Sequence, residues 1–337
     1  MFKLSKRVKV IVNYVLSPVL FVVLTASIYN KVTHQENLQA SLGIIKNAFN
    51  GTNAWIMGLV LFLTIINWGI EARKWQIIVR TVQPIGLFTA FKSVLTGLAM
   101  SLFIPSRLGE YVGRVFYMQE GNRLRSVPFT VVAGLAQMIV TLSAGVAGLV
   151  YIRSTILQRQ PLLQGLNDIW LVGFMYVISF IVLVFVLIYY RLAWLSKLLR
   201  NIPLVAKYSY FIESIETFHW KALTRILSLS AGRFLVFILQ YLLILHVFKV
   251  EVSMLQGACM VSVLFLVLAV LPTIPIAELG LRGQASIQLF GLISANTVGI
   301  VATSSGIWLI NLIVPAIAGS LFILGVKIFR KQDETDV

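Results

Sequence analysis

The sequence has little charge and almost no cysteine. Only 12% of its 337 residues are Asp, Glu, Lys or Arg, against roughly 25% in an ordinary soluble protein. The single cysteine, Cys259, excludes an internal disulfide, and three scattered histidines form no metal-ligand pattern. No Gly-rich phosphate loop and no Ser/His/Asp arrangement is present, so the residues predict no bound cofactor and no familiar hydrolytic site.

Apolar sequence of membrane-spanning length fills most of the chain. Hydrophobic residues make up 58% of the total, and the mean hydropathy is +0.90. This composition predicts an all-α polytopic membrane protein with one membrane domain over residues 1–337. The net charge of +16 comes from basic residues at the ends of apolar segments. We therefore expect anionic membrane lipids as partners, and no nucleic acid.

Six apolar runs are long enough to cross a bilayer as single helices. They are residues 10–28, 54–70, 127–150, 169–190, 226–247 and 303–326. Two further apolar regions, 87–117 and 252–292, are longer than one helix needs and are broken near the middle by Pro, Gly and charge. We interpret each as a re-entrant pair of broken helices that enters and leaves by the same face.

The lysines and arginines orient these spans. With the N-terminus inside, the predicted cytoplasmic segments hold eighteen of them, Lys74 among these, and the outer segments hold five. Both termini are then cytoplasmic. Units 54–150 and 226–326 have the same order of elements and opposite orientations. They form an inverted repeat of the kind that transporters use.

The first broken region carries a charged motif. Arg107, Glu110 and Arg114 are spaced three and four residues apart, which places them on one face of a helix. Pro105 suits the first turn of a half-helix, and Gly109 permits close approach of a neighbouring backbone. Such arginines suit a phosphate or lipid headgroup. A structural ion pair, or an interfacial loop with ordinary basic residues, remains the alternative.

The second broken region repeats this chemistry. Pro272 and Pro275 cannot both lie inside a regular helix, and Gly280 follows them. Glu278 and Arg282 are four residues apart, in the order that favours a helical ion pair. We expect the two motifs to lie together, as binding residues or as structural pairs.

Polar residues also occur within the apolar runs. We interpret most of them as contacts between helices: Asn67, Gln137, Gln240, Gln284, Gln288 and Asn311. Arg233 lies about two turns inside its span, and we interpret it as snorkelling to the cytoplasmic surface. Glu110 and Glu278 are then the carboxylates expected inside the membrane.

These residues suggest a family. Residues 105–110 and the arginine at 114 resemble the Pro-x-Arg-x-Gly-Glu pattern of the lysylphosphatidylglycerol synthase transmembrane region family, also called flippase-like domain proteins. Residues 275–282 resemble its second, Gly- and Arg-containing pattern, although Glu278 replaces a usual Gly and Gly283 a usual Glu. In the best-known members this domain moves aminoacylated phosphatidylglycerol between leaflets, and a separate soluble domain makes that lipid. The resemblance implies lipid translocation without the soluble synthase domain.

We therefore expect a flippase-like lipid transporter rather than an enzyme. Arg107, Arg114 and Arg282 would hold an anionic headgroup of a phospholipid or lipid-linked substrate, and Glu110 and Glu278 would balance them. One alternative is a membrane enzyme, or an enzyme partner, acting on lipid-linked sugars or headgroups. Another is a membrane subunit that transports nothing. Either a separate synthase or a glycosyltransferase is a possible partner.

Overall fold

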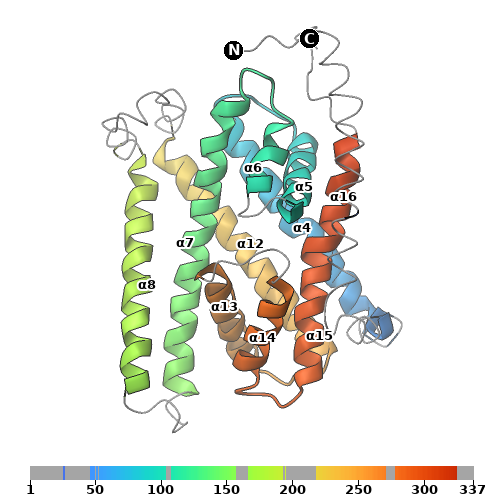
Figure 1. The fold of residues 1–337 in the computed structure, drawn as a ribbon, viewed down its shortest axis with the longest axis vertical. Coiled ribbons are helices and arrows are strands. Elements are labelled where there is room, and N and C mark those ends of the chain that lie inside the picture. The colour runs from blue at the N-terminus through green and yellow to red at the C-terminus, as the bar shows by residue number, and fades with distance from the viewer. Residues whose placement is uncertain are drawn as a thin grey trace.

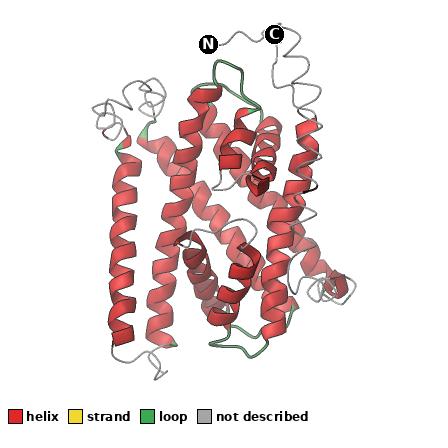
Figure 2. Ribbon diagram, in the orientation of Figure 1, coloured by secondary structure: helices red, strands yellow, loops and turns green. Residues whose placement is uncertain are grey.

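The computed structural model describes residues 46–49, 53–103, 108–156, 166–192, 218–270 and 278–324, together with residues 26, 51 and 194. The regular structure in these ranges is helical throughout (Figure 2). In chain order it comprises α4 (Ala54–Val79), α5 (Leu87–Phe103), α6 (Leu108–Val115), α7 (Arg123–Thr155), α8 (Leu166–Tyr190), α12 (Trp220–Val247), α13 (Met254–Val270), α14 (Glu278–Phe290), α15 (Thr297–Trp308), the π-helical turn η4 (Leu309–Ile313) and α16 (Val314–Leu324).

Within the described residues, five helical segments are long and apolar enough to cross a membrane. They are Ala54–Val79, Arg123–Thr155, Asp168–Tyr190, Trp220–Val247 and Thr297–Leu324. They match five of the six predicted spans, while the predicted span at 10–28 lies outside the described residues. Apolar helices of this length satisfy their own backbone hydrogen bonds in lipid. The chain is therefore a multi-pass helical membrane protein.

Each of the two broken regions contains two shorter helices. In the first, α5 and α6 pack against each other as an antiparallel hairpin, because Gly109 faces Met100 and Gly113 faces Gly97. A Cβ atom on Gly109 would overlap the backbone carbonyl of Met100. Glycine is therefore required at this contact, as the sequence predicted.

The two hairpins occupy opposite ends of the molecule and pack on helices from the other half of the chain. In Figure 1, α5 and α6 lie in the upper half and α13 and α14 in the lower half. Helix α7 packs on α13, where Gly148 meets the backbone carbonyl of Cys259. Helix α16 packs on α5, where Gly319 meets the backbone carbonyl of Leu95. Small residues permit both close contacts.

Helices α4 and α12 cross the molecule between these hairpins and run antiparallel to each other (Figure 1). Their contact is polar along much of its length. Near one end, the Gln240 side chain donates to the Val60 carbonyl at 3.0 Å and to Thr64 Oγ1 at 2.9 Å. These bonds confirm the interpretation of Gln240 as a contact between helices. Further along the same interface lies a cluster of charged side chains.

Candidate functional site

The charged cluster begins on the last part of α4, mostly beyond residue 70, where the predicted span ends. The helix continues to Val79, so Asn67, Glu71 and Lys74 lie on one helical face at spacings of four and three. Both Glu71, at 3% exposure, and Lys74, at 1%, are buried. The prediction that Lys74 lies in a segment between two spans is therefore wrong. Hydropathy ends a span at its first charges, but charges that pair inside the protein allow the helix to continue.

Glu71 is the centre of the cluster. Lys74 Nζ lies 2.7 Å from Glu71 Oε2, Arg114 Nη2 lies 2.9 Å from Oε1, and Arg233 Nη1 lies 3.2 Å from Oε2. A buried carboxylate is tolerated only when cations and hydrogen bonds surround it in this way. The expectation that Glu110 and Glu278 would be the carboxylates inside the membrane is therefore wrong, since it omitted Glu71.

Arg114 connects the first hairpin to α4. Its guanidinium reaches Glu71 and also lies 3.4 Å from Glu110 Oε2, the ion pair that their spacing predicts. The guanidinium carbon lies 5.2 Å from the centre of the Trp75 ring, a cation–π contact. Arg114 is 3% exposed, whereas the Glu110 side chain is 32% exposed. The buried partner, Glu71, makes the shorter contact.

Arg233 connects α12 to the same carboxylate. Its Nε donates to Asn67 Oδ1 at 2.9 Å, and its guanidinium carbon lies 5.0 Å from the centre of the Trp68 ring. The side chain is only 14% exposed. The interpretation of Arg233 as a snorkelling residue is therefore wrong, because its partners lie on α4 within the span.

Lys74 extends the cluster to a third long helix. Besides its ion pair with Glu71, its ammonium donates to Ser230 Oγ on α12 at 3.3 Å and to the Ala133 carbonyl on α7 at 3.5 Å. The cluster therefore joins α4, α6 and α12 through side chains that are buried or largely buried, and reaches α7 through the backbone carbonyl of Ala133. We therefore expect the loss of any of these contacts to change the packing of the other helices in the cluster.

Several buried N–H groups around Glu71 have no hydrogen-bond acceptor in the part of the chain that the structure describes. They are Arg114 Nε and Nη1, Asn67 Nδ2, Trp68 Nε1 and Trp75 Nε1. Buried donors in proteins are almost always paired, so a group of unpaired donors needs an explanation. An anionic group with several oxygens would match a cationic cluster of this kind.

The second predicted motif approaches this cluster through aromatic rings. The Arg282 guanidinium carbon lies 5.9 Å from the centre of the Phe265 ring, and that ring centre lies 5.6 Å from that of Phe237. Arg233 in turn lies 5.3 Å from the centre of the Phe237 ring. Two neighbouring rings thus separate the arginine of the second motif from one of the three cations around Glu71.

The remaining predicted site residues contribute less to this picture. Pro105, Arg107, Pro272 and Pro275 lie outside the described residues, and of Glu278 only the backbone is described. Gly280 is the third residue of α14, and a Cβ atom there would meet no other heavy atom within 4 Å. No close helix contact therefore requires a glycine at this position.

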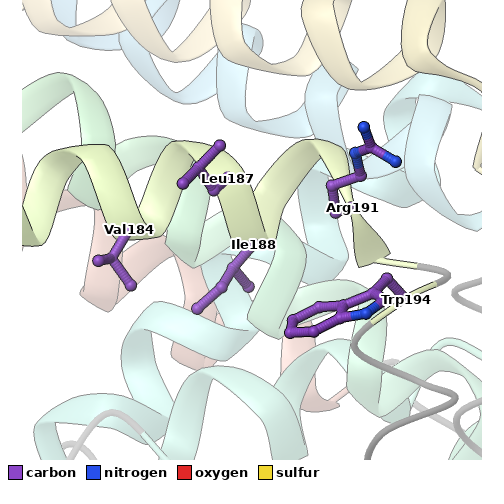
Figure 3. A pocket seen from close by; sticks show the side chains of 5 residues that line it. All are labelled: Val184, Leu187, Ile188, Arg191 and Trp194. Atoms are coloured by element: carbon purple, nitrogen blue, oxygen red, sulfur yellow. The ribbon is translucent and has the colours of Figure 1, made fainter.

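A shallow apolar hollow lies apart from these charges, on the outer helix α8. Figure 3 shows Val184, Leu187 and Ile188 along it, with Arg191 and Trp194 beyond the end of the helix. Its volume is about 440 Å³. An apolar surface with an arginine and a tryptophan at its end is typical of a helix that faces lipid at the membrane interface. None of the predicted site residues lines it.

Comparison with known protein families confirms the family that the two charged motifs suggested. The lysylphosphatidylglycerol synthase TM region matches this chain over residues 11–319, which include both charged motifs and the whole Glu71 cluster. A search of curated proteins gives no match. A match over most of the chain, together with the apolar helices, relates the protein to lipid handling in the membrane. The chain belongs to the lysylphosphatidylglycerol synthase transmembrane region family.

Proposed function

We propose that this protein binds the headgroup of a membrane lipid at the Glu71 cluster and moves the lipid between leaflets. The observation that carries the proposal is the environment of Arg114. This side chain is buried beside Glu71, yet two of its nitrogens have no acceptor among the described residues. A guanidinium favours phosphate and other anionic oxygens as acceptors. The oxygens of a lipid headgroup would supply the acceptors that Arg114 Nε and Nη1 need at different edges of the guanidinium.

The proposed site combines predicted residues with residues that the structure adds. Arg114 and Arg233 provide the cationic surface around Glu71, and Glu110 stands at its more exposed side. Arg282 is proposed as a second headgroup contact, reached past Phe237 and Phe265. We also propose Arg107 and Glu278 as headgroup-binding residues, because they belong to the two charged motifs of the sequence.

The proposed topology is an inverted repeat of units 54–150 and 226–326, each with one re-entrant pair, and with both termini in the bacterial cytoplasm. Reciprocal packing supports it: α7 of the first unit packs on α13, and α16 of the second packs on α5. The antiparallel pairing of α4 with α12, the first helices of the two units, also supports opposite orientations. In such folds the substrate binds between the repeats.

Transport in this arrangement requires the charge cluster to rearrange. Arg114 contacts a buried carboxylate on α4 and a partly exposed one on its own helix. A headgroup anion bound to Arg114 would compete with both carboxylates and so weaken the link between α6 and α4. Movement of the first hairpin against α4 and α12 would then open the site to one leaflet at a time. The lipid would shift the protein between the state with the α6–α4 link intact and the state with it weakened, because it binds the second state more tightly.

An enzyme, or an enzyme partner that acts on lipid-linked sugars or headgroups, remains the second candidate. Such an enzyme needs a carboxylate that can exchange protons with its substrate. Glu71 is enclosed by three cationic side chains, which favours a role in holding the arginines. Glu110 is the more exposed carboxylate and is the residue that an enzymatic role would use.

A leaflet-exchange assay in proteoliposomes tests the proposal. The probe is a fluorescent phosphatidylglycerol, and the variants are Arg114→Ala, Arg114→Lys and the control Arg153→Ala. Removing a buried charged contact costs about 2 kcal/mol or more, so Arg114→Ala should slow exchange roughly 30-fold or more. Lysine should restore little because it lacks the planar fork. Arg153 pairs with Asp168 at a half-exposed site, and its loss should leave exchange unchanged. Full exchange by folded Arg114→Ala protein would refute the proposal.

A further inference from the structure

The last membrane span contains a π-helical turn. Between α15 and α16, residues Leu309–Ile313 are wound more widely, and the N–H of Val314 donates to the Leu309 carbonyl five residues earlier. Pro315 follows directly and has no N–H, so the α-helical bond to the Asn311 carbonyl cannot form. Single π-helical turns inside long helices occur frequently at functional sites.

Asn311 lies within this turn and is buried without a partner. The side chain is 6% exposed, and neither its amide nitrogen nor its amide oxygen has a hydrogen-bond partner within the described ranges. Gln240, by contrast, donates twice to α4 and links two helices. The sequence predicts that Asn311 contacts another helix as Gln240 does, and the contacts do not support that role.

Trp308 adds a second unpartnered polar group one turn earlier. The side chain is 2% exposed, and its indole Nε1 has no acceptor among the residues described. Trp308 directly precedes the π-helical turn, three residues before Asn311. The turn thus carries a buried donor at its start and a buried amide within it.

This part of the span packs against the helix that carries Glu71. Trp308 belongs to the same buried core as Trp68 and Trp75, the rings that contact Arg233 and Arg114. The π-helical turn itself packs on α4. The unpartnered groups of Trp308 and Asn311 therefore lie on a segment that shares its core with the Glu71 cluster.

The arginines around Glu71 and the amide of Asn311 favour different ligands. An arginine only donates hydrogen bonds and favours an anion, whereas an asparagine amide donates through its nitrogen and accepts through its oxygen. A hydroxyl group also donates and accepts, so it can satisfy both atoms of Asn311. We propose that Asn311 and Trp308 form a neutral subsite for a hydroxyl group of the lipid headgroup. This inference rests on the proposed function and adds that the substrate is an anionic lipid whose headgroup carries a free hydroxyl.

Two fluorescent lipids with identical acyl chains test the subsite. Phosphatidylglycerol carries one phosphodiester and two hydroxyls, and phosphatidylmethanol carries the same anion without a hydroxyl. In the leaflet-exchange assay, wild-type protein should move phosphatidylglycerol about ten-fold faster. Asn311→Leu should slow phosphatidylglycerol about ten-fold and leave phosphatidylmethanol unchanged, because only the hydroxyl contact is lost. The control Gln240→Leu removes a helix contact and should keep the wild-type ratio between the two lipids.

The outcomes separate this inference from the proposed function. If wild-type protein moves both lipids equally, or if Asn311→Leu slows both by the same factor, the subsite is refuted and transport stands. If neither lipid moves, the proposed function is refuted, and thermal stabilisation by short-chain forms of the same two lipids decides the subsite. A larger stabilisation by phosphatidylglycerol that Asn311→Leu abolishes supports it, and equal stabilisation by both lipids overturns it.

Discussion

Arg114 and Glu71 form a buried ion pair, with Nη2 and Oε1 2.9 Å apart, between two elements separated by a long stretch of sequence. The pair ties the α5–α6 hairpin to α4, while Arg233 ties the same carboxylate to α12. The carboxylate of Glu71 therefore binds one arginine from each half of the chain. Its neutralisation should affect stability and function together.

Glu71→Gln should destabilise the protein strongly. The change leaves three buried cations without their shared carboxylate, and breaking a buried pair costs about 3–5 kcal/mol. The control is Asp168→Asn, which removes the half-exposed pair with Arg153 and should leave the unfolding midpoint almost unchanged, because solvent screens this pair. Thermal unfolding of both variants in detergent measures the difference. Equal midpoints would contradict the buried cluster.

Gly109→Ala should disrupt the first hairpin. A Cβ atom at this position would overlap the Met100 carbonyl, and a backbone atom cannot move aside as a side chain can. Overpacking of this kind costs about 1–3 kcal/mol. Gly134→Ala on α7 is the matched control, because a Cβ atom there meets no heavy atom within 4 Å. The unfolding midpoint should fall for Gly109→Ala alone, and an unchanged midpoint would exclude the close helix contact.

The proposed topology predicts which loops an impermeant thiol reagent reaches. In a Cys259→Ser background, a cysteine at Asn122, between α6 and α7, should stay unlabelled in intact cells. A cysteine at Lys249, between α12 and α13, should be labelled from outside. Labelling at both positions after the membrane is permeabilised provides the control. External labelling at Asn122 would refute the re-entrant interpretation of the first pair.

Much of the helical organisation could be predicted from the sequence, because apolar length and the position of breaks are local properties. The predicted spans 127–150 and 226–247 fall within α7 and α12, and Glu110 and Arg114 pair at their predicted spacing. The extension of α4 to Val79 could not be predicted from hydropathy, since it depends on partners from α6 and α12. Only the spacing of Asn67, Glu71 and Lys74 offered a signal for the buried face.

Arg233 shows why the centre of the site was missed. A lone arginine inside a span has two low-energy solutions: it reaches the interface along its own helix, or it finds an anion on another helix. The choice depends on whether a carboxylate from a distant segment lies within reach. Local sequence carries no information on that distance, and the structure places Glu71 Oε2 at 3.2 Å from Arg233 Nη1.

The two solutions for Arg233 make opposite predictions for Arg233→Met. If the side chain snorkelled, methionine would remove a charge from an apolar span at little or no cost. With the observed contacts, methionine leaves Asn67 Oδ1 without its donor and removes one of the two cations at Glu71 Oε2, so we expect a loss of about 2–4 kcal/mol. In a double-mutant cycle with Glu71→Gln, the coupling energy should be about 0.5–3 kcal/mol. Arg225→Met, at an exposed position near the start of α12, should change the unfolding free energy by less than about 0.5 kcal/mol. Additive effects of Arg233→Met and Glu71→Gln would show that the two side chains do not interact in the membrane.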